Sequence, residues 1–224
     1  MNFGPQTPEA EAFEILDAAV EAGINFIDTA NQYGGHLGVG TTETLLGRWL
    51  AQNPGRRDRL VLATKVHEPM SDDINDRGLS ARHIQMACDA SLKRLQVDHI
   101  DLYQMHRPDP ATPIEESLEA FDRLVAAGKV GAIGTSTFSA AQLDELHTLA
   151  GDRGWARPTS EQPPYSALAR DIETDVLPAL RRWDVGAIVW APLNGGWLTG
   201  KYQQVDRDAA DAQSRAQRQP DHFD

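Results

Sequence analysis

Residues 24–35 read INFIDTANQYGG, a short apolar run that turns polar where it ends. Two later stretches follow the same plan, RLVLATKV at 59–66 and HIDLYQMHRPD at 99–109. Because the carboxyl ends of parallel strands open onto one face of an α/β fold, groups at these ends can meet in one pocket. An acid, a phenol, an amine and an imidazole stand there, which suggests proton chemistry. They are Asp28, Tyr33, Lys65 and His106.

Short apolar runs alternate with amphipathic stretches along the chain. Most of the runs are apolar on both faces, which is typical of strands covered on both sides. Strands are predicted at 24–29, 59–66, 97–105, 130–136, 158–162 and 185–191. Helices are predicted at 7–23, 43–51, 81–95, 113–127, 140–150 and 171–182. This repeated βα pattern without a linker predicts one domain over residues 1–224, of which residues 203–224 are expected to be a flexible tail.

Capping residues mark several of the expected helix boundaries. Thr7 is predicted as the N-cap of the first helix, because a proline follows it at the first helical position. Capping boxes are predicted at 112–115 and 139–142. Gly128 and Gly151 stand where two helices are expected to end.

Composition is typical of an enzyme-sized domain. The 224 residues can bury a substantial core, and no apolar stretch approaches the length of a membrane span. A net charge of −12 disfavours nucleic acid and anionic membranes as partners. The single cysteine, Cys88, cannot form an internal disulfide, and no signal peptide is seen, so a cytoplasmic location is expected.

Two parallel architectures compete, the closed βα barrel and the open doubly wound sheet. The doubly wound sheet would carry a glycine fingerprint after its first strand, and YGGHLGVG at 33–40 has neither that spacing nor that position. Candidate catalytic groups on several successive strands favour the barrel.

Six ordered motifs resemble those of the aldo-keto reductases, and NDRGLSARHI at 75–84 is similar to a bacterial branch of that family. The motifs are FIDTANQYG (26–34), LVLATKV (60–66), DLYQMHRPD (101–109), VGAIGTSTFS (130–139), SEQPPYS (160–166) and VWAPLNGGWLTGKY (189–202). The resemblance implies a (β/α)8 TIM-type barrel that reduces aldehydes and ketones with NADP(H), or with NAD(H), and without a metal. Small carbonyl compounds are therefore the expected substrates.

The resemblance maps the family's catalytic tetrad onto Asp28, Tyr33, Lys65 and His106. Carbonyl reduction needs a proton at oxygen, and Tyr33 is the expected general acid. A phenol titrates near ~10, so a neighbouring cation eases its deprotonation. Lys65 is expected to supply that charge and Asp28 to orient it. His106 is expected to donate a hydrogen bond to the substrate oxygen.

The same resemblance predicts a nicotinamide site. Ser136 and Gln162 are expected to bind the carboxamide, and Trp190 to stack on the ring where the family usually has a tyrosine. Thr137 departs from the family's asparagine. The expected cofactor residues are Ser136, Thr137, Gln162, Trp190, Pro192, Leu193, Gly195, Gly196 and Leu198.

Six full strands are expected where closure of the barrel needs eight, so the barrel is interpreted as incomplete, with strands two to seven retained and the first and eighth largely missing. The resulting open strand edges favour self-association. Two other functions stay open: a binding or regulatory subunit without turnover, and a barrel isomerase that uses Lys65 or His106 as a base.

Overall fold

The computed structural model describes residues 3–200 of the chain. Within this range one parallel sheet has strands that follow each other in sequence order. The strands are β1 (Phe26–Asp28), β2 (Val61–Val66), β3 (Ile100–Met105), β4 (Val130–Ser136), β5 (Pro158–Gln162) and β6 (Gly186–Ala187). A doubly wound sheet would reverse its order at a switch point, so this topology excludes that alternative.

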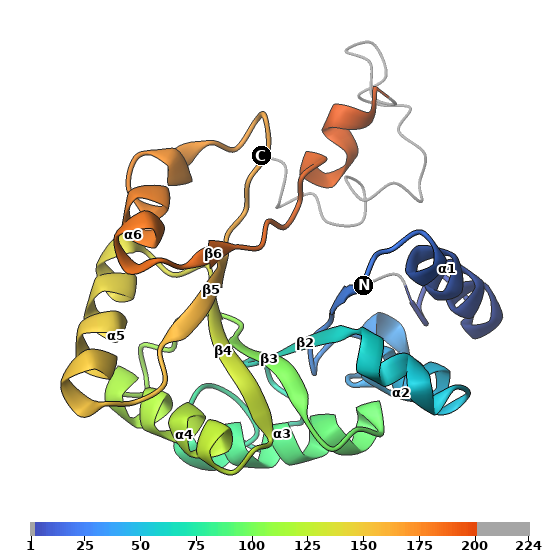
Figure 1. Ribbon diagram of the computed structural model, residues 1–224, viewed down its shortest axis with the longest axis horizontal. Coiled ribbons are helices and arrows are strands. Elements are labelled where there is room, and N and C mark those ends of the chain that lie inside the picture. Colours follow the sequence, from blue (N-terminus) through green and yellow to red (C-terminus); the bar gives the residue numbers. More distant parts are fainter. Residues whose placement is uncertain (1–2, 201–224) are drawn as a thin grey trace.

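Helices alternate with the strands. They are α1 (Glu9–Glu21), α2 (Thr41–Ala51), α3 (Ala81–Leu95), α4 (Ile114–Ala126), α5 (Ala140–Arg153) and α6 (Val176–Trp183), with short 3₁₀ turns η1 (Gly35–Leu37), η2 (Pro54–Arg59), η3 (Asp171–Glu173) and η4 (Asn194–Thr199). Figure 1 shows the sheet curled, with α2 to α6 in an arc around its outside. This half-barrel confirms the predicted incomplete (β/α)8 fold, with β1 to β6 in the places of strands two to seven.

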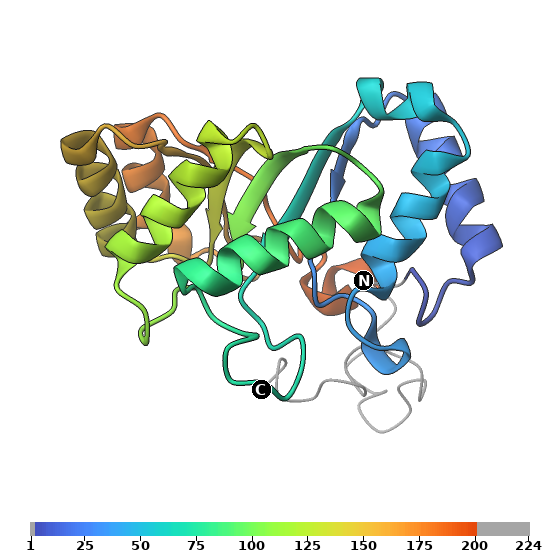
Figure 2. The same ribbon diagram turned by 90° about the horizontal axis from the view of Figure 1, so that it is seen from below.

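The carboxyl ends of the strands lie on one side of the molecule. Figure 2 shows η1, which follows β1, and the segment 67–80, which follows β2, projecting from the same edge. Side chains placed at the ends of successive strands can therefore face a common space, as the sequence predicts.

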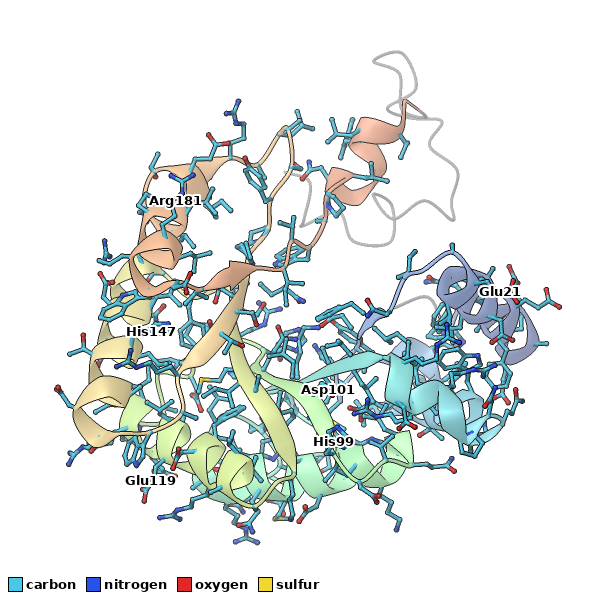
Figure 3. All side chains as sticks on the ribbon, viewed as in Figure 1. Glu21, His99, Asp101, Glu119, His147 and Arg181 are labelled. Atoms are coloured by element: carbon cyan, nitrogen blue, oxygen red, sulfur yellow. The ribbon has the colours of Figure 1, made fainter. Side chains whose placement is uncertain are left out.

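Apolar side chains fill the layer between the sheet and the helices. Tyr103 of β3 is fully buried, and its ring centroid lies 5.2 Å from that of Phe121 on α4. Burial of an apolar side chain such as that of Phe121 stabilises the fold by about 1.5–3 kcal/mol. Charged residues such as Glu21 and Arg181 are exposed on the outer side of the helices (Figure 3). This division follows the amphipathic helical pattern.

The inner face of the sheet is polar. Lys65 of β2 is in register with Gln104 of β3, Gln104 with Gly134 of β4, and Gly134 with Ser160 of β5. Side chains alternate along a strand, so Gln104 points away from the helix layer that Tyr103 contacts. A Cβ at Gly134 would lie 2.5 Å from the Ser160 hydroxyl oxygen, so this layer is closely packed there.

Four of the predicted strands are shorter in the structure: 59–66 and 97–105 begin later, as β2 and β3, and the two outer strands shorten most. The run 24–29 is a strand only at β1, and 185–191 only at β6, with an isolated bridge between Pro164 and Trp190. Each is paired on one side only among the described residues. Pro163 and Pro164 have no backbone N–H, so the ladder between β5 and the segment after β6 cannot continue regularly.

Three capping predictions are wrong. Pro8, without a side-chain cap, is the N-cap of α1 instead of Thr7. The capping box at 112–115 does not form, because α4 has Pro113 as its N-cap without a side-chain cap, and the Thr112 hydroxyl donates to the Asp109 carboxylate at 2.8 Å. α5 continues through Gly151, which is helical, and ends before Gly154, whose φ is 69°. The box at 139–142 is confirmed.

The predicted helix at 171–182 divides into η3 and α6, because Asp175 caps a separate helix at Val176. The predicted tail, 203–224, lies outside the described residues. Among residues 3–200, no helix is both long enough and apolar enough to cross a membrane.

Candidate active site

A buried lysine lies at the centre of the site. Lys65, at the end of β2, has no solvent exposure, and its Nζ donates to the Asp28 carboxylate at 2.6 Å and to the Thr29 carbonyl at 2.8 Å. Both partners belong to the end of β1 and the residue after it. The buried ammonium is therefore held by one charge and one backbone dipole, which offsets part of its desolvation cost.

Tyr33 and His106 complete the cluster. The Lys65 Nζ lies 5.2 Å from the centroid of the Tyr33 ring, and the Tyr33 and His106 rings meet edge to face at 5.8 Å. The backbone of Tyr33 is tied to Ala30 on one side and to Thr42 at the start of α2 on the other. Four residues from three strand ends are thus brought together as the sequence predicts; their catalytic roles stay predictions.

Burial sets the electrostatics of this cluster. Desolvation lowers the pKa of Lys65, and the Asp28 charge opposes that shift. Burial first, and the Lys65 charge second, lower the pKa of His106 from 6.5 to about 4. The imidazole is therefore neutral at neutral pH, where it has one N–H to donate and one nitrogen to accept.

The lowered pKa of His106 makes the stability of the fold pH-dependent. The imidazole binds protons near pH ~6.5 in the unfolded chain and only near about 4 in the folded one. The unfolded state therefore takes up more protons in this window. The stability is fully present above about pH 6.5 and is lost as pH falls toward 4, by on the order of 3 kcal/mol.

We expect His106→Gln to flatten this part of the curve, because glutamine does not titrate. Thermal unfolding of both proteins between about pH 7 and about pH 4.5 measures it. The wild-type protein should lose more stability than the variant over that range. Parallel curves would contradict the assigned protonation state.

Two of the predicted cofactor residues lie side by side. Ser136 ends β4 and Gln162 ends β5; the two are in register, and the Ser136 hydroxyl donates to the Gln162 backbone carbonyl at 2.8 Å. Both are buried. Thr137 follows in the left-handed region, with φ 60°. These neighbours form a compact polar group at the carboxyl end of the sheet.

The remaining cofactor candidates lie on the segment after β6. Trp190 is 38% exposed, and its backbone pairs with Pro163 and Tyr165. Gly195 and Gly196 have φ of 67° and 108°, which only glycine adopts easily. The other three are exposed; they are Pro192, Leu193 and Leu198.

Sequence reasoning missed Gln104. Its Nε2 donates to the second Asp28 oxygen at 3.1 Å, so Asp28 is held by Lys65 and Gln104 together. A signal was present: Gln104 is a polar residue in an apolar strand and precedes His106 by two positions, which puts the two on the same face. Among residues 3–200, no cluster of three or more His, Cys, Asp or Glu is arranged to hold a metal ion.

Comparison with known sequences identifies a protein family that matches this chain. The sequence pattern of the Aldo/keto reductase family matches residues 1–221. The chain is 48% identical to "Uncharacterized oxidoreductase YrpG" of Bacillus subtilis, over 90% of the chain and 63% of that protein. It is 39% identical to "6-dehydroglucose reductase" of Novosphingobium aromaticivorans, over 92% of the chain and 66% of that protein.

A third relative has a different description. The chain is 37% identical to "Probable voltage-gated potassium channel subunit beta" of Arabidopsis thaliana, over 91% of the chain and 61% of that protein. The chain thus spans less than two thirds of the length of the relatives named here. The family match over nearly all of the sequence, together with the half-barrel and the motifs at its strand ends, shows that the chain belongs to the aldo/keto reductase family.

Proposed function

We propose that this protein reduces an aldehyde or ketone to the alcohol, with NADPH, or else NADH, as the hydride donor. The observation that carries the proposal is the buried Lys65 ammonium, which Asp28 holds beside the Tyr33 ring. The ring of His106 contacts that of Tyr33 edge to face. A cation in that place stabilises a phenolate, so a tyrosine beside it releases its proton more readily.

Each residue of the cluster has a distinct part in the proposed reaction. Tyr33 delivers a proton to the developing alkoxide, and Lys65 stabilises the phenolate that remains. Asp28 keeps the ammonium oriented. Neutral His106 donates a hydrogen bond to the same substrate oxygen and so selects which face of the carbonyl is presented.

The described residues suit a nicotinamide cofactor. Gln162 and Ser136 offer polar groups at adjacent strand ends, and Trp190 offers a partly exposed indole face. Gly195 and Gly196 adopt positive φ angles and carry no Cβ, so the backbone there leaves room for a ligand to approach closely. Bound there, the nicotinamide supplies the hydride.

A turnover assay tests the proposal. The full chain is mixed with NADPH or NADH and a panel of small aldehydes and ketones, and the loss of reduced-nicotinamide absorbance is followed. We expect turnover with at least one of these carbonyl compounds. Failure to bind either cofactor, together with no turnover on any carbonyl, would contradict the proposed function.

Trp190 gives an independent optical test. If its ring stacks on the nicotinamide, NADPH should quench part of the indole emission, and Trp190→Leu should abolish that part. The thermal transition should change little, because the side chain is 38% exposed. Trp155→Leu, at the amino-end side of β5, is the matched control and should retain the quenching. A fall in melting temperature without a change in quenching would favour simple packing.

We further propose that a polypeptide limited to these residues self-associates. β1 and β6 are the edges of the described sheet, and Ile24, Phe26 and Val189 are exposed beside them. Unpaired edges with apolar neighbours favour strand pairing between molecules. Light scattering should show oligomers that Phe26→Lys reduces. A monodisperse monomer at all concentrations would contradict this.

The second candidate function is a binding subunit without turnover. It is supported by the similarity to the plant protein whose name describes a potassium channel subunit beta. The turnover assay separates the two functions, because a pure binding subunit would bind NADPH and reduce no carbonyl.

For the cellular compartment we propose the cytoplasm, since the buried, unpaired Cys88 is compatible with reducing conditions.

A further inference from the structure

Glu161 is a buried carboxylate that the proposed reaction does not use. It has no solvent exposure and lies on β5 between Ser160 and Gln162. Because side chains alternate along a strand, Glu161 faces the opposite side of the sheet from Gln162. A buried carboxylate needs hydrogen-bond or ion-pair partners, since burial without them strongly disfavours its charge.

The partners of Glu161 all come from the end of β4 and the turn that follows it. Oε2 accepts from the Thr135 hydroxyl at 2.5 Å, and Oε1 accepts from the Phe138 backbone N–H at 3.1 Å. The Thr137 N–H, which lies between these two donors in the chain, donates instead to the Gln162 backbone carbonyl at 3.4 Å. Within residues 3–200, no ion pair includes Glu161, so hydrogen bonds alone hold it, and burial raises its pKa to about 7.

The turn held in this way has an unfavourable conformation. Thr137 has φ 60°, in the left-handed region that a β-branched residue rarely adopts. Glu161 holds this turn from both sides, because it accepts from the Thr135 hydroxyl before it and from the Phe138 N–H after it. These contacts offset the strain at Thr137 and fix where the turn places its neighbours.

The neighbours of this turn are Ser136 and Gln162, the polar residues of the expected carboxamide site. The Ser136 hydroxyl donates to the Gln162 carbonyl, so its oxygen keeps its lone pairs for a donor from outside. A carboxamide NH₂ is such a donor. If the turn relaxed, the Ser136 hydroxyl would lose this orientation.

We propose that Glu161 is a positioning residue for the nicotinamide carboxamide: it holds the turn at 136–138 so that Ser136 and Thr137 meet the ligand together with Gln162. The inference rests on the proposed function. Glu161 acts through these residues and does not touch the cofactor. Its loss therefore weakens recognition of the nicotinamide end of the cofactor and leaves recognition of the adenosine end intact.

The experiment compares two ligands that differ at that end. Titration calorimetry on the full chain measures binding of NADPH and of 2′,5′-ADP, which lacks the nicotinamide. Glu161→Ala should weaken NADPH binding about tenfold, which corresponds to the loss of roughly one hydrogen bond between the relaxed turn and the carboxamide, and should leave 2′,5′-ADP binding unchanged. Glu161→Gln, which keeps one acceptor, should fall between. The KM for NADPH should rise more than kcat falls.

Glu43→Gln is the matched control. Glu43 is equally buried, accepts from Thr64 and Arg94, and belongs to α2. A purely structural loss should lower the melting temperature in this variant without changing the ratio of the two affinities. If Glu161→Ala does not fold, Glu161→Gln carries the comparison.

Thr137→Gly adds a coupling test, because glycine adopts this φ without strain. Glu161→Gln should weaken NADPH binding less when combined with Thr137→Gly than alone. Equal weakening of both ligands by the Glu161 variants, or NADPH binding unchanged by them, would overturn this inference alone. If the unaltered protein binds no nicotinamide cofactor, the proposed function falls with it.

Discussion

Tyr33→Phe is expected to lower kcat by about 10²- to 10⁴-fold, the usual contribution of a positioned general acid. The phenyl ring retains the edge-to-face contact with His106 and the place beside the Lys65 ammonium, so the variant should fold and bind cofactor as before. Because the hydroxyl acts mainly in the transition state, KM should change little.

Steady-state kinetics with a reducible aldehyde measures this effect, and NADPH titration of the same variant is the control. A variant with normal cofactor binding and normal kcat would show that the proton comes from another group. A loss confined to KM would instead assign Tyr33 to substrate binding.

Lys65→Met is expected to be nearly as severe, with kcat reduced by about 10²- to 10³-fold, because the charge that stabilises the phenolate is removed. Methionine has a similar length and no charge, so it fills the fully buried site. Asp28 keeps its hydrogen bond from Gln104, and its side chain is 29% exposed, so it remains solvated. The fold should therefore persist.

The pH profile distinguishes this role from a packing role. If Lys65 eases the release of the Tyr33 proton, the residual activity of Lys65→Met should depend on pH differently from that of the wild-type protein. Circular dichroism and the thermal transition are the controls for folding. Unchanged kcat in a folded Lys65→Met protein would overturn the proposed arrangement.

The fold could be predicted from the sequence to a large extent. The strands at 130–136 and 158–162 and the helix at 81–95 have the predicted boundaries. Their interiors carry strong apolar patterns, and Ser80 and Ser139 cap helices by local contacts that the sequence itself contains. The boundaries that failed depend on residues distant in sequence or on the strand pairing at the two edges of the described sheet. β6 is short because its outer side is unpaired among the described residues.

The candidate site was likewise only partly predictable from the sequence. The sequence indicates Asp28, Tyr33, Lys65 and His106, since each follows a recognisable apolar run. It does not indicate that Gln104 also holds Asp28, because that bond joins residues far apart in the chain. The sequence also could not predict the lowered pKa of His106, because every segment that packs around the ring contributes to its desolvation.

The sequence by itself determined the alternation of strands and helices and the identity of the groups at the strand ends, because apolar period and turn chemistry are local properties. The tertiary structure alone decided which polar partners those groups have. Thr112 bonds to Asp109 instead of capping α4, and Glu161 bonds to the turn after β4. In each case several hydrogen-bonding partners compete, and the packed sheet decides which of them lies within reach.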